Sequence, residues 1–130
     1  MPVTAALPPL ALVMIGGSIG AGLRYVVGRW ALANFGPGLP VGTWIVNIAG
    51  GLAMGLLAGW IAARAAPGDE AVRLLLGVGV LGGFTTFSAF SLEVVNMILR
   101  GDIALASAYA VSSVAGSVVA LWCGLMLARA

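Results

Sequence analysis

The sequence predicts an all-α integral membrane protein in which four helices cross the bilayer and the third is interrupted. Hydrophobic residues make up 62% of the 130 residues and charged residues only 8%, and the mean hydropathy is +1.14. No water-soluble domain of this length carries such a composition on its surface. The apolar residues fall into four runs, each long enough to cross a bilayer, since about 20 residues suffice.

The first two runs carry glycines at spacings that favour close helix packing. The first run covers about residues 10–30, follows a proline pair, and places Gly16 and Gly20 four positions apart. The second run covers about residues 41–63 and follows the turn-rich segment NFGPGLP. Its glycines at positions 51, 55 and 59 form a ridge of minimal side chains. Such faces favour contact with protein rather than lipid.

The third run, about residues 72–99, contains the segment GVGVLGGFTTFSAFS, which we interpret as a helix broken at Gly82–Thr86. Each glycine lowers helix propensity by about 1 kcal/mol. Irregular backbone at membrane depth is tolerated where it packs in protein or lines a polar site. A turn at residues 100–102 leads into the fourth run, about residues 103–128. The chain, residues 1–130, is expected to form one four-helix domain.

The distribution of arginines bears on orientation in the membrane. Four spans place both termini on one side, together with Arg64, Arg73 and Arg129, whereas Arg24, Arg29 and Arg100 fall on the other side. Lysine and arginine in short loops set orientation, and three against three gives no bias. The chain can then insert both ways up, unless short loops give uninformative counts or Arg24 is embedded. Four short helices are few for enclosing a pore, so a homodimer is the economical expectation.

Several polar residues inside the apolar runs are candidate functional residues. Asn47 offers amide donors to an anion, although asparagine in membranes also commonly forms interhelical hydrogen bonds. Arg24 either reaches a partner or extends to the interface from the end of its helix. Glu93 is an intramembrane carboxylate, which marks a candidate site, and it can equally bond Asn96 or a neighbouring hydroxyl.

A column of hydroxyls and a group of aromatic rings complete the candidates. Tyr109, Ser113 and Ser117 recur at steps of four and share one helix face. Such a column suits a hydrated path, and serines also simply permit close packing. Phe87 and Phe90 share a face if a helix resumes after the break, and their positive ring edges can stabilise an anion. Packing is the plainer role for these rings.

Three segments together resemble the Fluc (CrcB) family of fluoride channels. They are GGSIGAGLRY, GTWIVNIAGGLAMG and GGFTTFSAFSLE, in this order on the first three spans. The third segment is highly specific, whereas glycine patterns alone are not. The resemblance extends over essentially the whole chain, including the Tyr109, Ser113 and Ser117 column.

The resemblance implies a dual-topology homodimer of antiparallel subunits in the bacterial inner membrane, with two passive fluoride pathways along the subunit interface. The pathway residues would be Asn47, Phe87, Phe90, Tyr109, Ser113 and Ser117. Further candidates for the pathway or its vestibule are Arg24, Glu93, Thr86 and Ser88. The carbonyls of Gly82 and Thr85 from both subunits would bind a structural sodium ion, for which carbonyl oxygens are suitable hard ligands.

Other classes of function fit less well. A small four-span proton-coupled drug or cation antiporter is the main alternative, but it needs a central carboxylate, and the first two spans contain none. A scaffold subunit would leave the broken helix and the hydroxyl column without a role. With no histidine, a single cysteine and no convergent acid pair, an enzyme or a transition-metal site is not expected. Six scattered cationic residues do not form a nucleic-acid surface.

Overall fold

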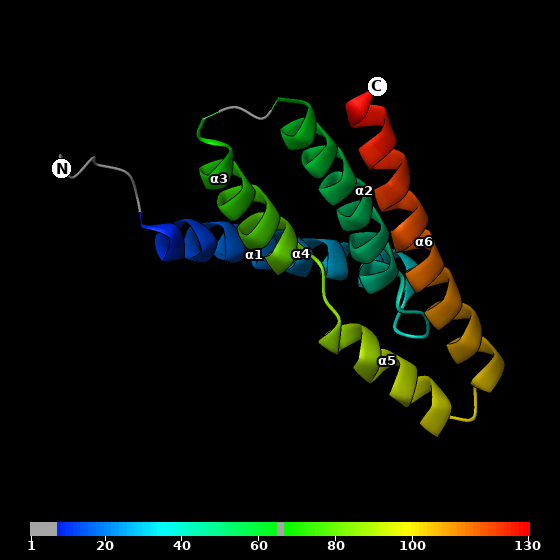
Figure 1. The fold of residues 1–130 in the computed structure, drawn as a ribbon. Coiled ribbons are helices and arrows are strands. Elements are labelled where there is room, and N and C mark those ends of the chain that lie inside the picture. Colours follow the sequence, from blue (N-terminus) through cyan, green and yellow to red (C-terminus); the bar gives the residue numbers. More distant parts are fainter. Residues whose placement is uncertain (1–7, 65–66) are drawn as a thin grey trace.

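The computed structural model describes residues 8–64 and 67–130, and every regular element in these ranges is a helix. The helices are α1 (Pro9–Phe35), α2 (Val41–Arg64), α3 (Asp69–Val72), the π-helix η1 (Arg73–Leu81), α4 (Gly82–Phe84), α5 (Ser88–Leu99) and α6 (Ile103–Arg129). The elements α3, η1 and α4 follow one another without a gap, and α5 continues after a short interruption (Figure 1).

Four helical stretches among the described residues are long and apolar enough to cross a membrane, which confirms the predicted number. They are Pro9–Phe35, Val41–Arg64, Asp69–Leu99 and Ile103–Arg129. The first helix extends beyond the predicted end at about residue 30, as far as Phe35, and Gly36, with a φ of 75°, follows as its C-cap. Residues other than glycine are strained at a positive φ of this size. The chain is therefore a multi-pass membrane protein.

Helices α2 and α6 run side by side in the same direction, in contact along the glycine ridge of α2 (Figure 1). A Cβ atom added at Gly51 would lie 2.7 Å from the Ser117 carbonyl oxygen, and one at Gly59 would lie 2.6 Å from the Leu125 carbonyl oxygen. At Gly55 an added Cβ would collide with the Leu121 carbonyl. The predicted use of these glycines for close helix packing is confirmed.

Helix α1 crosses η1 and α4 through glycine contacts of the same kind, passing behind them in the view of Figure 1. An added Cβ at Gly79 would lie 2.8 Å from the Gly16 Cα atom, and one at Gly20 would collide with the Val80 carbonyl. At Gly83 it would lie 2.5 Å from the Gly17 carbonyl oxygen. Helix α1 thus touches the third span with backbone against backbone.

The third span is interrupted as predicted, but the interruption begins later than Gly82. The chain stays helical through Phe84, and only residues 85–87 leave the helix. Thr85 has extended backbone, with φ −84° and ψ 159°. The prediction that Gly82 itself breaks the helix is wrong, because Gly82 is helical and Gly83 serves close packing against α1.

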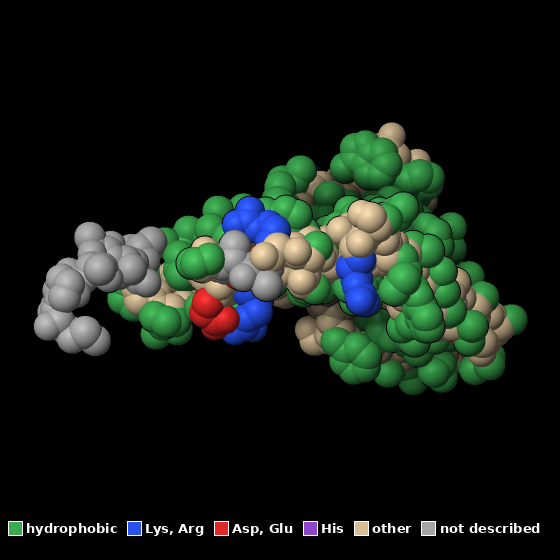
Figure 2. Space-filling view, turned by 45° about the horizontal axis from the view of Figure 1, so that its top comes forward, with side chains coloured by type: hydrophobic (Ala, Val, Ile, Leu, Met, Phe, Trp, Pro, Cys, Tyr) green, Lys and Arg blue, Asp and Glu red, His purple; other side chains and the backbone are tan. Residues whose placement is uncertain are grey.

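Much of the apolar surface of the protomer is uncovered. Figure 2 shows hydrophobic side chains over most of the visible face, with charged side chains in small groups. The buried cluster is small and is formed by Phe90, Met97, Ala106 and Tyr109, which pack α5 against α6. Exposed apolar surface of this extent needs cover by lipid or protein.

Candidate functional site

The interruption of the third span lies beside a cavity of about 390 Å³ between α2, α5 and α6. The predicted pathway residues in its lining are Asn47, Thr86, Phe87, Phe90, Ser113 and Ser117. They come from the three helices α2, α5 and α6 and from the interruption, positions far apart in the sequence. The cavity wall is otherwise apolar, including Met54, Val114 and Leu121.

Asn47 joins α2 to the interruption through both ends of its side-chain amide. Its Nδ2 donates to the Thr86 carbonyl oxygen at 3.0 Å, and its Oδ1 accepts from the Thr86 N–H at 2.9 Å. The asparagine was predicted either to donate to an anion or to bond within the protein. The structure shows the bonds within the protein, and they occupy one of the two amide hydrogens.

Other hydrogen bonds satisfy much of the backbone around the interruption. The Leu81 carbonyl accepts from the Thr85 N–H at 3.0 Å and from the Thr85 hydroxyl at 2.9 Å. The Thr86 hydroxyl accepts from the Ala89 N–H at 3.2 Å, an arrangement that favours the start of a helix. Within the described part of the chain, no hydrogen bond reaches the carbonyls of Gly82 and Thr85. These two oxygens remain available to another partner.

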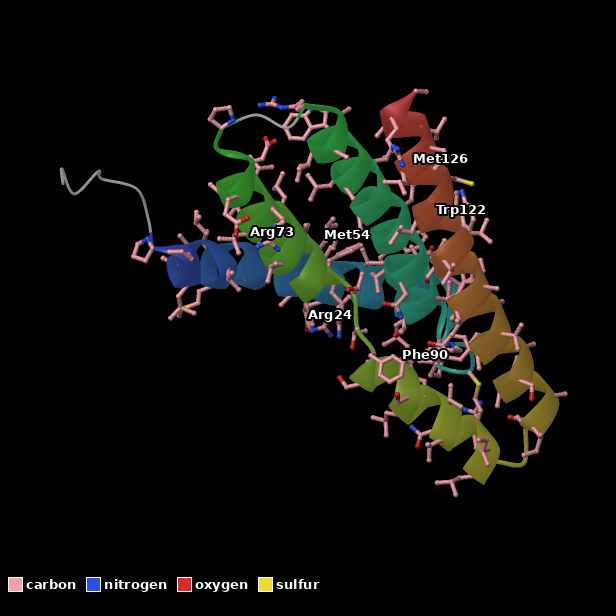
Figure 3. The ribbon with its side chains drawn as sticks, in the orientation of Figure 1. Arg24, Met54, Arg73, Phe90, Trp122 and Met126 are labelled. Carbon is pink, nitrogen blue, oxygen red and sulfur yellow. The ribbon has the colours of Figure 1, made fainter. Side chains whose placement is uncertain are left out.

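Arg24 reaches inward from α1 to the end of the helical segment that finishes at Phe84. Its Nε donates to the Gly83 carbonyl oxygen at 3.1 Å, in a part-buried position. Figure 3 shows the Arg24 side chain at the level where α4 ends. A cation there complements the partial negative charge of a helix C-terminus. The alternative, in which Arg24 only extends toward the interface, does not describe this contact.

The two candidate phenylalanines share one side of the resumed helix but differ in exposure. The Phe87 and Phe90 ring centroids are 5.9 Å apart, and Phe90 lies 5.2 Å from the Tyr109 ring. Phe90, in the first turn of α5 (Figure 3), is 9% exposed, whereas Phe87 is 78% exposed. The rings therefore form a short aromatic row from the core to the protomer surface.

The hydroxyl column lies on α6 as predicted, and part of it is buried. Tyr109 and Ser113 are buried, and their hydroxyls make no hydrogen bond among the described residues. Ser113 and Ser117 line the cavity, whereas Tyr109 packs on Phe90. Buried hydroxyls without partners are uncommon in proteins. These groups are suited to a polar guest such as water or an anion.

Glu93 lies apart from this cavity, beside a second one of about 330 Å³. Its Oε1 accepts a hydrogen bond of 2.6 Å from the Thr43 hydroxyl. The sequence left open a bond to Asn96 or to a neighbouring hydroxyl, and the structure shows a hydroxyl. Ser88, in contrast, is exposed and lines neither cavity.

Sequence reasoning missed Thr43, although a signal for it was present. Thr43 precedes Asn47 by four residues, so both polar side chains share one face of α2. Trp44, the next residue, donates from Nε1 to the Ser112 hydroxyl at 3.0 Å. The start of α2 therefore holds three separate segments, since Thr43 binds α5, Trp44 binds α6, and Asn47 binds the interruption.

Comparison with known proteins identifies similar chains over nearly the full length. The family model described as "CrcB-like protein, Camphor Resistance (CrcB)" matches residues 11–125. A fluoride-specific ion channel FluC of Phenylobacterium zucineum is 58% identical over 120 residues, which cover 92% of this chain and 94% of the relative. The protein of the same name from Hyphomonas neptunium is 55% identical over 118 residues, covering 91% and 93%.

Proposed function

This chain belongs to the CrcB family, whose similar members are named fluoride-specific ion channels, and on that premise we propose that it conducts fluoride passively out of the cytoplasm. The observation that carries the proposal is the cavity at the interruption, where Asn47, Phe87 and Ser113 meet. The named relatives are ion channels and not enzymes, in agreement with the prediction for this chain.

The proposed mechanism replaces the water around fluoride with uncharged donors. Amide and hydroxyl hydrogens of Asn47, Ser113 and Ser117, and the ring edges of Phe87 and Phe90, would meet the ion in succession. Ser113 supports this role because its hydroxyl is buried beside the cavity without a partner among the described residues. Several weak sites allow an ion to enter and also to leave.

The functional unit that we propose is a dual-topology homodimer in the inner membrane, with two pathways. Phe87 supports a second copy, because its ring is 78% exposed on the protomer although it adjoins the cavity. A polar path with one wall of lipid would leave its donors unsatisfied. An antiparallel partner would cover the ring and close the path.

We further propose that a structural sodium ion binds at the interruption. The carbonyls of Gly82 and Thr85 suit this role, because they accept no hydrogen bond within the described chain, whereas those of Leu81, Gly83 and Thr86 each accept at least one. Carbonyl oxygens are hard ligands suited to such a cation. A high-resolution map of the dimer is expected to contain sodium-sized density between these oxygens. A fully occupied water with hydrogen-bond distances instead would contradict the proposal.

The proposed conduction is tested by efflux from liposomes that contain the purified protein. A fluoride-selective electrode is expected to record rapid efflux from fluoride-loaded vesicles, and a chloride electrode no efflux above protein-free vesicles. Equal efflux of the two ions would refute selectivity. A pH-sensitive dye inside the vesicles tests the antiporter alternative, which requires proton movement in exchange for a cationic substrate.

A further inference from the structure

We propose that Asn47 is a positioning residue that fixes the backbone of the interruption, and that it affects fluoride mainly through Thr86 and the rings that follow. The inference rests on the proposed fluoride conduction and goes beyond a role for Asn47 as one of the pathway donors. It begins with the paired hydrogen bonds between the Asn47 amide and Thr86.

The chemistry of the amide explains why asparagine suits this position. Leaving the helix at residues 85–87 frees the N–H and the carbonyl of Thr86 from helical hydrogen bonds, at a depth where water does not satisfy them. A side-chain amide carries a carbonyl oxygen and N–H donors in one plane, as a peptide group carries a carbonyl oxygen and one N–H. Asn47 donates to the Thr86 carbonyl at 3.0 Å and accepts from its N–H at 2.9 Å. It therefore replaces a missing backbone neighbour.

The same pairing fixes which way round the amide lies. With Oδ1 turned to the Thr86 N–H and one Nδ2 hydrogen on the Thr86 carbonyl, a single amide hydrogen remains unassigned. Asn47 also lines the cavity. A reversed amide would offer its oxygen there, which repels an anion. The Thr86 pair thus keeps the acceptor atom occupied and leaves a donor.

Thr86 passes this constraint to the aromatic row. It directly precedes Phe87, and its hydroxyl accepts from the Ala89 N–H at 3.2 Å, within the first turn of α5. Phe87 and Phe90 follow from that turn, with ring centroids 5.9 Å apart. Because Phe87 is 78% exposed, little packing within the protomer holds its ring. Within the protomer, the backbone at Thr86 is therefore the main determinant of where this ring lies.

The first test compares the ring position and fluoride efflux in Asn47→Ser. Serine can still donate to an anion, but it is too short to bond both groups of Thr86. A 4-fluorophenylalanine label at position 87 reports the ring by fluorine NMR in fluoride-free buffer, and efflux is measured without the label. We expect a shifted or broadened label signal, and efflux reduced at least about tenfold, the factor that corresponds to losing about 1.4 kcal/mol.

The control is Trp44→Phe, which removes a hydrogen bond of similar length from the same end of α2, the one to Ser112 at 3.0 Å. It leaves the interruption untouched, so label signal and efflux should equal those of the wild type. If Asn47→Ser loses efflux with an unchanged label signal, Asn47 acts only by touching the ion and the proposal is overturned. Wild-type values for both measurements in Asn47→Ser overturn it as well.

A second variant decides the question if Asn47→Ser fails to fold. Replacing Thr86 by its α-hydroxy acid analogue exchanges the N–H for an ester oxygen, which removes the bond to Asn47 Oδ1 and leaves every side chain in place. We expect the same direction of change in label signal and efflux, and wild-type behaviour overturns the proposal. The label signal does not depend on conduction. If the wild-type protein shows no fluoride efflux but the label signal still shifts in the variants, the proposed function has failed and the positioning role has not.

Discussion

At the scale of single residues, Phe87 and Phe90 show how two identical side chains three positions apart serve different ends. Phe90 packs on Tyr109 and belongs to the small buried cluster. Phe87 is 78% exposed and contributes little to the stability of the protomer. An exposed aromatic ring beside a cavity is better explained by what the cavity holds or by a covering partner than by packing within the chain.

The replacement Phe87→Ile is expected to abolish fluoride efflux from liposomes without loss of stability. Isoleucine keeps an apolar side chain but lacks the positive ring edge that can face an anion. We expect efflux to fall at least about tenfold, the factor for about 1.4 kcal/mol of lost stabilisation. The melting temperature in detergent should stay close to that of the wild type. Phe35→Ile, at a ring that is 52% exposed beside Trp30, is the matched control and should conduct normally. Unchanged efflux in Phe87→Ile would remove the ring from the mechanism.

The candidate site could be predicted from the sequence as a set of residue types, but not as a network of contacts. Asn47 was recognised because an asparagine in an apolar run is costly unless it bonds something. Its partner is the backbone of Thr86, and a backbone group leaves no mark in the sequence. Thr43 was overlooked because threonine is tolerated in membrane helices without a special role, and its bond to Glu93 depends on how α2 meets α5.

At the scale of helices, glycine governs which elements touch. Helix α2 contacts α6, and α1 contacts η1 and α4, so closely that a Cβ atom on the glycines would collide with the backbone of the facing helix. Hydrophobic burial does not drive helix association in lipid, so packing at close range has to supply the stabilisation. The glycine spacings therefore predicted these contacts correctly. The location of the interruption was predicted less well, since Gly82 and Gly83 suit both a break and a close approach.

The replacement Gly55→Ala is expected to destabilise the contact between α2 and α6. The added Cβ would collide with the Leu121 carbonyl, which is helix backbone and cannot rotate away. Overpacking typically costs about 1–3 kcal/mol, more than the gain of about 1 kcal/mol in helix propensity. Gly22→Ala is the control, because no atom lies within 4 Å of a Cβ built there. Melting curves in detergent should show a lowered midpoint for Gly55→Ala only, and equal midpoints would refute the close-packing role.

At the scale of the whole molecule, the two ends of the helix bundle carry similar charge. Ion pairs join Arg64 to Asp69 at 3.7 Å and Arg73 to Glu70 at 2.7 Å at the end that holds the C-terminus. Arg100 pairs with Asp102 at 3.3 Å at the other end. Arg24 instead bonds the Gly83 carbonyl in the interior, so the surface arginines number three against two. The bias that orients membrane proteins stays small.

This balance leads to a prediction about orientation and its link to conduction. A cysteine added after Ala130, with the exposed Cys123 replaced by serine, should react with an impermeant maleimide on both faces of the membrane. Three lysines added at the same end should confine labelling to the cytoplasmic face, because added terminal charge can reverse a weakly biased topology. Three lysines inserted in the loop at residues 36–40 should confine the C-terminal label to the opposite face. If the channel is an antiparallel dimer, each biased variant alone should lose fluoride efflux, and coexpression of the two should restore it. One-sided labelling of the unbiased protein, or full efflux from a biased variant alone, would contradict dual topology.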